Sequence, residues 1–358
     1  MAVKVVRQPG KIALLGAPTS AAALVPGHEA GPAALRSAGL INRLKEVGYD
    51  VVDLGDDPVQ ISLPDPENPR TRNLPAVVKS LETLKPKVEQ AVKSGALPLI
   101  VSGDCSVALA TVAGVRRYLR NVGLIYVDRD ADLNTPATTL SGSLDGMVVS
   151  HLIGRGAPEL VRLWGQPPLV REPDMLLFGV DRLDPPEQEW LKNSMLPRSL
   201  ASDIHRLGAG RAAHLALEQI HASKFDFVLH FDVDVISDFQ FTNYPGQGGL
   251  SADEAREILS IFLSQERLAA LEVTAYNPQN DSAGAGAKLI LELLTTALRA
   301  RIESADSRAG AGESAPVTEL LPEPPAGTPP QTSAQVPGNA DPLVESPGLP
   351  PSIGSQDE

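Results

Sequence analysis

Two short acidic segments of the chain carry the residue types that bind metal ions. Asp128, Asp130 and Asp132 alternate in the sequence Val-Asp-Arg-Asp-Ala-Asp, and far downstream Asp232 and Asp234 alternate in His-Phe-Asp-Val-Asp. Carboxylates crowded together repel one another unless cations or protons compensate their charge. One such segment alone is typical of a solvated turn after a strand. Two of them favour a metal site that is built across neighbouring strands.

The segments that precede both acidic motifs have the pattern of buried strands. Residues 123–127 and 225–231 are short apolar runs, so the carboxylates would follow the carboxyl ends of strands, where open α/β sheets bind ligands. His230 lies inside the second run. We expect it to be a core residue whose polar atoms are satisfied, with a supporting role beside the Asp232 motif as the alternative.

Strand and helix patterns alternate along the rest of the chain. This alternation predicts an α/β fold with a mostly parallel sheet, covered by helices on both faces. Further strands are expected at residues 11–17, 50–54, 96–101, 174–180 and 268–273, and helices at residues 32–47, 74–93, 107–119, 147–153, 185–193, 211–222, 252–263 and 285–302.

Composition and charge restrict the class of protein. The length of 358 residues suits one large α/β domain with an appendage, and the net charge of −13 argues against a nucleic-acid partner. Cys105 is the only cysteine, which excludes an intrachain disulfide. The sequence shows neither a signal-peptide pattern nor a long apolar run, so we expect a cytoplasmic protein without a membrane partner.

The character of the sequence changes after residue 304. Residues 305–358 hold 11 of the 32 prolines, and eight acidic residues stand there against one basic residue, Arg308. Such a segment cannot bury enough apolar surface to offset the entropy lost on ordering. We therefore predict one domain over residues 1–304 and a disordered, acidic, Pro-rich tail over 305–358, with a partner-binding arm as the alternative for the tail.

An ordered series of motifs resembles the arginase (ureohydrolase) family, which includes agmatinases and formiminoglutamases. Residues 102–106 are similar to the family motif Gly-Gly-Asp-His-Ser, and residues 128–132 to Asp-Ala-His-Ala-Asp. Residues 134–136 match Asn-Thr-Pro of the substrate loop, and residues 232–234 match the second metal motif. Residues 277–278 match the end of a Glu-x-Asn-Pro motif. Each motif is weak alone, but the ordered series is specific.

The resemblance extends over residues 11–301 and implies a three-layer α/β/α sandwich with a binuclear manganese centre. In the family, a metal-bridging hydroxide attacks a guanidinium or amidine carbon, and the metals lower the pKa of the bound water. The matches imply the metal ligands Cys105, Asp128, Asp130, Asp132, Asp232 and Asp234, the substrate-binding residues Asn134 and Ser141, and the catalytic residues Asp130 and Asp145.

Four positions depart from the family pattern. Cys105 and Asp130 stand where the family has ligand histidines, Asp145 replaces a proton-shuttling histidine, and Ala275 replaces the acid before Asn-Pro. Cys105 is either a ligand or a small buried side chain, and Asp130 is either a replacement ligand or a residue without a metal. Asp145 either acts as a general acid, which needs a raised pKa, or makes a loop contact.

Asp130 makes the site more anionic, and a Cys105 thiolate or an ionised Asp145 adds to this charge. Excess negative charge makes a bound water harder to deprotonate. An oxygen-rich ligand set suits Mg, Ca or Mn, whereas a cysteine suits Zn. The family resemblance favours Mn, with Ni, Zn or Mg as alternatives.

Two functions are consistent with this sequence. The first is a metal-dependent hydrolase that cleaves C–N bonds in a small linear amidine or guanidine. The second is a metal-free pseudoenzyme subunit of arginase fold that scaffolds or regulates an active partner. The resemblance implies a homo-oligomer, a trimer or hexamer, in the first case and a hetero-oligomer with an active paralogue in the second.

Overall fold

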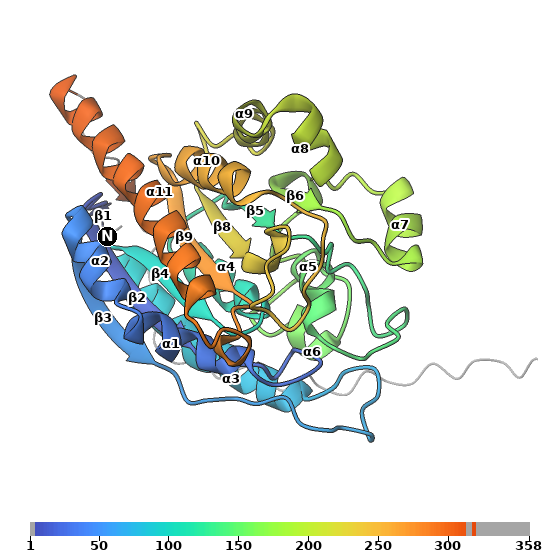
Figure 1. Ribbon diagram of the computed structural model, residues 1–358. Coiled ribbons are helices and arrows are strands. Elements are labelled where there is room, and N and C mark those ends of the chain that lie inside the picture. Colours follow the sequence, from blue (N-terminus) through green and yellow to red (C-terminus); the bar gives the residue numbers. More distant parts are fainter. Residues whose placement is uncertain (1–3, 313–316, 320–358) are drawn as a thin grey trace, which may run out of the picture. The chain divides into compact units, whose positions relative to one another are not determined.

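The computed structural model of the chain describes residues 4–312 and 317–319, which contain an eight-stranded sheet (Figure 1). The strands lie in the order β3-β2-β4-β9-β8-β5-β6-β7, and all neighbours run parallel. The strands of this sheet are β2 (Lys11–Ala17), β3 (Asp50–Asp56), β4 (Leu97–Ser102), β5 (Gly123–Val127), β6 (Met175–Val180), β7 (Arg198–Leu200), β8 (Phe227–Asp232) and β9 (Leu268–Thr274).

Helices cover both faces of the sheet, which confirms the predicted three-layer α/β/α class. The α-helices are α1 (Gly31–Ser37), α2 (Leu40–Val47), α3 (Leu74–Lys93), α4 (Val107–Arg116), α5 (Val148–Leu152), α6 (Pro158–Val161), α7 (Pro185–Lys192), α8 (Ala201–Leu207), α9 (Ala209–Gln219), α10 (Ala252–Leu263) and α11 (Ala285–Gly310).

The sheet separates two hydrophobic cores. In β2, Ile12 and Leu14 pack into the core shared with α1, α2 and α8–α11, whereas Ala13 and Leu15 pack into the core shared with α3, α4 and α5. Successive side chains of a strand point to opposite faces, and both faces are covered here. The strands therefore read as continuous apolar runs in the sequence.

The sheet order brings the acidic motifs together. β5 and β8 are neighbours, with Val127 opposite Phe231, so Asp128 and Asp232 leave the same edge of the sheet side by side. β9 and then β4 follow on the other side of β8, and β4 leads into the turn that holds Cys105. The carboxyl ends of four adjacent strands thus form the site.

Several local predictions differ from the structure. The helix expected over residues 32–47 is divided into α1 and α2, because Gly39 has a φ of 96° and interrupts the helical path. The short edge strand β7 and the helices α6 and α8 were not predicted. The three residues of β7 are too few to display a strand periodicity.

The C-terminal helix is longer than predicted. α11 continues beyond Ile302 to Gly310, so the first residues of the predicted tail are helical. The first proline after Ile302 is Pro316, and nothing before it removes a backbone N–H group. Val317–Glu319 forms β10, which pairs antiparallel with β1 (Lys4–Val6). The rest of the predicted tail, residues 313–316 and 320–358, lies outside the described residues.

Candidate metal centre

The two acidic motifs adopt the same local geometry. Asp128 Oδ1 accepts a hydrogen bond from the Asp130 backbone N–H at 2.7 Å, and Asp232 Oδ1 accepts one from the Asp234 N–H at 2.7 Å. Aspartate side chains commonly bond the backbone two residues on. Each turn fixes the first carboxylate at the strand end and directs the second toward the same region. All but Asp130 are buried.

Cys105 contacts this group of carboxylates directly. Its Sγ donates to Asp232 Oδ2 at 2.9 Å, and its backbone N–H donates to Asp145 Oδ1 at 2.8 Å. Burial raises the pKa of the Cys105 thiol well above its usual value, and the charge of Asp232 raises it further. Cys105 is therefore both a buried side chain and a neighbour of the predicted ligands.

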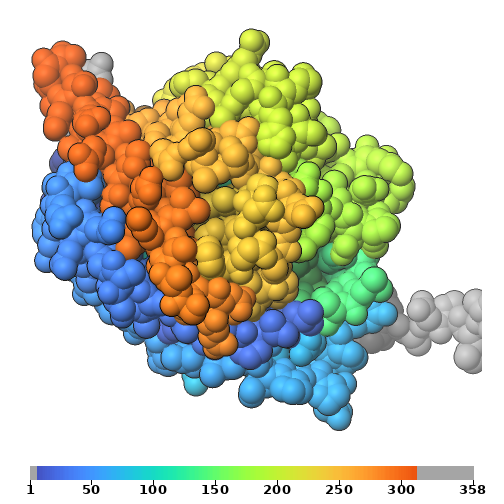
Figure 2. All heavy atoms as spheres, viewed as in Figure 1, coloured from blue at the N-terminus to red at the C-terminus, as the bar shows by residue number. Residues whose placement is uncertain are grey.

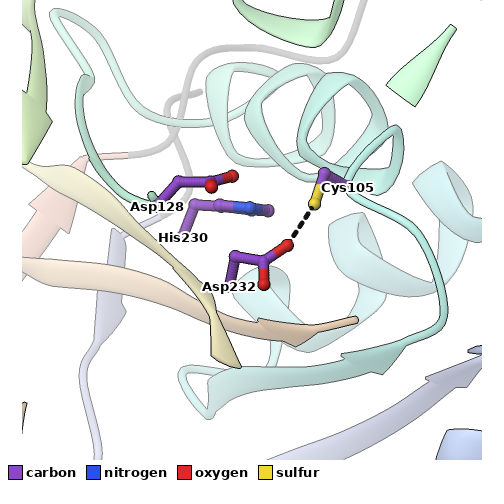
Figure 3. A group of neighbouring side chains, drawn as sticks. All are labelled: Cys105, Asp128, His230 and Asp232. Atoms are coloured by element: carbon purple, nitrogen blue, oxygen red, sulfur yellow. Dashed lines mark hydrogen bonds between the residues drawn. The ribbon is translucent and has the colours of Figure 1, made fainter. Parts of the chain in front are cut away.

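His230 completes one candidate set of metal ligands (Figure 3). Ligand atoms of Cys105, Asp128, His230 and Asp232 all lie within 4.8 Å of one another. The prediction that the polar atoms of His230 all have hydrogen-bond partners is right for only one of its two nitrogens. Nδ1 lies 2.8 Å from Glu272 Oε2, whereas Nε2 has no hydrogen-bond partner among the described residues. The signal in the sequence was the two-residue spacing of His230 and Asp232, which places both on one face of β8.

A second candidate set shares Asp128 with the first. Ligand atoms of Asp128, Asp130 and Asp234 also lie within 4.8 Å of one another. Two arginines compensate this set: Arg182 forms a two-pronged ion pair with Asp130, and Arg129 lies 3.3 Å from Asp234. We did not predict a role for either arginine, although Arg129 lies within the first acidic motif.

Asp132 lies apart from both sets. Its Oδ2 accepts a hydrogen bond from Tyr126 Oη at 2.5 Å, and its backbone has a φ of 50°. Burial raises the pKa of Asp132 well above the usual range, and the negative charge of Asp145 adds to this effect.

A cavity of about 430 Å³ connects these residues, and its size is typical of a small-molecule site. All the site residues predicted from the sequence line it, including Asn134, Ser141 and Asp145. Asp184 and Glu187, which were not predicted, add two further carboxylates. The Asn134 amide donates to Asp184 Oδ2 at 2.8 Å.

A loop of residues 237–250 borders the cavity through Tyr244. The Leu24 N–H donates to Tyr244 Oη at 2.8 Å, and the Asn280 side chain donates to the Thr242 carbonyl at 2.7 Å. The loop thus lies between residues 20–28 and the segment that precedes α11 (Figure 2). Contacts between segments distant in the sequence hold this border in place.

Burial and mutual repulsion destabilise the ionised form of these carboxyl groups. The pKa of Asp128 is raised well above its usual value by burial and then by the charge of Asp232. The pKa of Asp234 is raised in the same way, and that of Asp145 by burial and by Asp104. Divalent cations relieve such repulsion.

The first set fits a metal ion better than the second. It combines buried carboxylates with a thiol and an unpartnered imidazole nitrogen, which are all metal ligands in proteins. In the second set, guanidinium groups already compensate Asp130 and Asp234, although Asp234 Oδ1 has no hydrogen-bond partner among the described residues.

Ala275 leaves no acid at the position two residues before Asn277. It is buried, has a φ of 67°, and its N–H donates to the Gly103 carbonyl at 2.7 Å. This backbone bond joins the end of β9 to the turn after β4, so the segment keeps its place without the acidic side chain.

An eight-stranded parallel sheet with a carboxylate-rich centre at its strand ends defines an arginase-like protein. The family model described as the arginase family matches residues 10–299, and the chain belongs to this family. The chain is 30% identical over 287 residues to the arginase of Bacillus caldovelox, covering 79% of this chain and 96% of that protein. It is 31% identical over 291 residues to the arginase of Bacillus subtilis, covering 80% and 97%.

The solved structures agree with the sequence comparison. The solved structure of the Bacillus caldovelox arginase superimposes with a TM-score of 0.74 and 28% identity, covering 81% of this chain and 98% of that chain. Family membership supports a hydrolase of guanidino C–N bonds. Within the described part of the chain, none of the helices has the length and apolar character needed to cross a membrane.

Proposed function

We propose that this protein is a metal-dependent hydrolase that cleaves a C–N bond in a small, linear, cationic guanidine or amidine. The observation that carries the proposal is the cavity of about 430 Å³. Buried carboxylates that could hold a metal line this cavity, together with further carboxylates outside the candidate ligand sets. A guanidinium or amidinium ion carries a positive charge, which complements this lining.

Metal binding in this proposal depends on Asp128 and Asp232, which belong to the candidate ligand sets, and on Cys105 beside them. Asp234 and Asp132 add charge around the same position. A divalent ion held there would lower the pKa of a bound water and polarise the substrate. Mn²⁺ is the ion that the family resemblance favours.

The other cavity residues would position the substrate and handle its proton. Asp145 is suited to general acid work because burial keeps its pKa raised while the Cys105 N–H holds Oδ1, which leaves Oδ2 to carry the proton. Asn134 and Ser141 would orient the substrate. Asp184 and Glu187 would face its cationic groups, and Ala275 argues for a substrate that does not need an acid at that position.

The test is turnover by the purified protein. The protein is loaded with Mn²⁺ and offered a panel of linear guanidines and amidines, including arginine and agmatine, while ammonia and urea release are measured. We expect turnover that chelation abolishes and that Asp232→Asn lowers by at least about 100-fold, since removing a ligand removes the metal. The absence of both turnover and stoichiometric metal would overturn the proposal.

The second candidate is a pseudoenzyme subunit of the same fold, and specific contacts favour it. Arg182 and Arg129 compensate Asp130 and Asp234, so these carboxylates do not require a second cation. Ala275 also lacks the acid of the family pattern. In this case the protein would purify from its host with an active paralogue. A homo-oligomer with robust turnover, established by sedimentation and assay, would rule this function out.

A further inference from the structure

A row of three buried side chains crosses the centre of the sheet beside the acidic motifs. Tyr126 on β5 is the register partner of His230 on β8, and His230 is the register partner of Glu272 on β9. All three are fully buried. The Tyr126 ring stacks on the imidazole with ring centroids 4.1 Å apart and an interplanar angle of 4°. These neighbours fix the imidazole in one orientation.

Glu272 determines which nitrogen of His230 is available. Its Oε2 lies 2.8 Å from Nδ1 of His230. An ionised carboxylate at this position would only accept a hydrogen bond, so that Nδ1 would carry the proton and the lone pair of Nε2 would be left for a ligand. Histidines that bind metals through one nitrogen commonly donate the other N–H group to a carboxylate in this way.

The free nitrogen belongs to a group of metal-binding side chains. Nδ1 is engaged by Glu272, whereas Nε2 is buried without a hydrogen-bond partner among the described residues. The imidazole extends toward Cys105 between Asp128 and Asp232 (Figure 3). Two donors on one ion lie less than about 4.5 Å apart, since each bond is about 2.0–2.3 Å long. The mutual separation of at most 4.8 Å in this group is close to that limit.

We propose that His230 Nε2 is a direct ligand of the metal held by Cys105, Asp128 and Asp232. This inference rests on one part of the proposed function, namely that a divalent ion binds at this position. The family motifs have histidines at the positions of Cys105 and Asp130, and here an imidazole comes instead from the neighbouring strand. Glu272 and Tyr126 are positioning residues that hold the ring. The resulting nitrogen, sulfur and oxygen set also accommodates softer ions such as Zn²⁺.

Pulsed EPR of the full-length protein with less than one equivalent of Mn²⁺ tests this assignment. We expect ¹⁴N coupling from a bound imidazole in the wild-type protein. His230→Gln should remove the coupling and weaken metal binding by at least about 10-fold, whereas the matched substitution of another buried histidine, His151→Gln on α5, should change neither. Glu272→Gln should keep the coupling but weaken binding by about 10-fold.

A second measurement keeps the test decisive if His230→Gln does not fold. In wild-type protein labelled with ¹⁵N-histidine, Zn²⁺ should shift the Nε2 resonance of one buried histidine while Nδ1 stays protonated. Bound metal without nitrogen coupling or a Zn²⁺-induced shift would overturn the role of His230 and leave the proposed function standing. That result is expected if the ring is an imidazolium that only pairs with Asp128 and Asp232. Failure of both ions to bind would overturn both proposals.

Discussion

Removal of the Arg182 side chain should strengthen binding of a second metal ion. Arg182 pairs with Asp130, which belongs to the second candidate ligand set with Asp128 and Asp234. Arg182→Met keeps much of the aliphatic stem but removes the charge. Asp130 is then free to act as a ligand, and the divalent ion no longer meets a neighbouring guanidinium group.

The magnitude follows from the charges and their exposure. A unit charge and a divalent ion about 8 Å apart repel by about 4 kcal/mol at an effective dielectric constant of about 20. The Arg182 side chain is 52% exposed, so solvent screens much of this repulsion. We take about 1–2 kcal/mol as the remaining effect, which corresponds to about a 5–30-fold change in the dissociation constant. Loss of the ion pair should cost about 1 kcal/mol of folding stability or less.

Titration with Mn²⁺, followed by EPR of the free ion, measures both binding steps. We expect the first step to change little and the second to become about 5–30-fold tighter in Arg182→Met. Arg171→Met is the matched control, because Arg171 is also an exposed arginine paired with an aspartate, Asp174. A second step that is unchanged or weaker in Arg182→Met, with the first step intact, would refute the view that Arg182 competes with a metal.

Three further predictions concern the thiol, pH and the core. In Co²⁺-loaded protein, Cys105→Ser should abolish the near-ultraviolet thiolate-to-metal absorption, and absence of that band from the wild type would exclude Cys105 as a ligand. Mn²⁺ affinity should fall as the pH is lowered, because burial and Asp232 raise the pKa of Asp128, so that the ion must displace protons. Calorimetry in buffers of different ionisation enthalpy should detect proton release, and its absence would contradict this account. Leu44→Ala should lower the free energy of unfolding by about 2–5 kcal/mol in denaturant titrations, since Leu44 is fully buried on α2, whereas a loss below about 1 kcal/mol would argue against that packing.

Most elements of the fold could be predicted from local sequence. β2, α3, β5 and α10 have the predicted boundaries, because apolar patterns with clear ends define them. The division between α1 and α2 depended on one glycine with positive φ, and β7 was too short to show a period. Such boundaries follow from local backbone geometry and neighbouring strands, which periodicity does not report.

The candidate site shows the same division between sequence and tertiary structure. The alternating aspartates and their place after apolar strands predicted a carboxylate cluster, because residue type and strand position are properties of the chain itself. Whether each carboxylate is free or compensated depends on side chains from other segments: Arg182 reaches Asp130 from the loop after β6. No spacing rule connects these two residues.

The sequence by itself determined the arginase fold and the acidic character of the centre. The physical reason is that motif residues and apolar runs are local properties of the chain, and each acidic motif directly follows an apolar run. Only the tertiary structure placed His230 between Tyr126 and Glu272 with Nε2 left unpartnered beside Cys105. The physical reason is the parallel sheet. It aligns residues from three separate strands in one row, and their meeting depends on strand order and register rather than on separation along the chain.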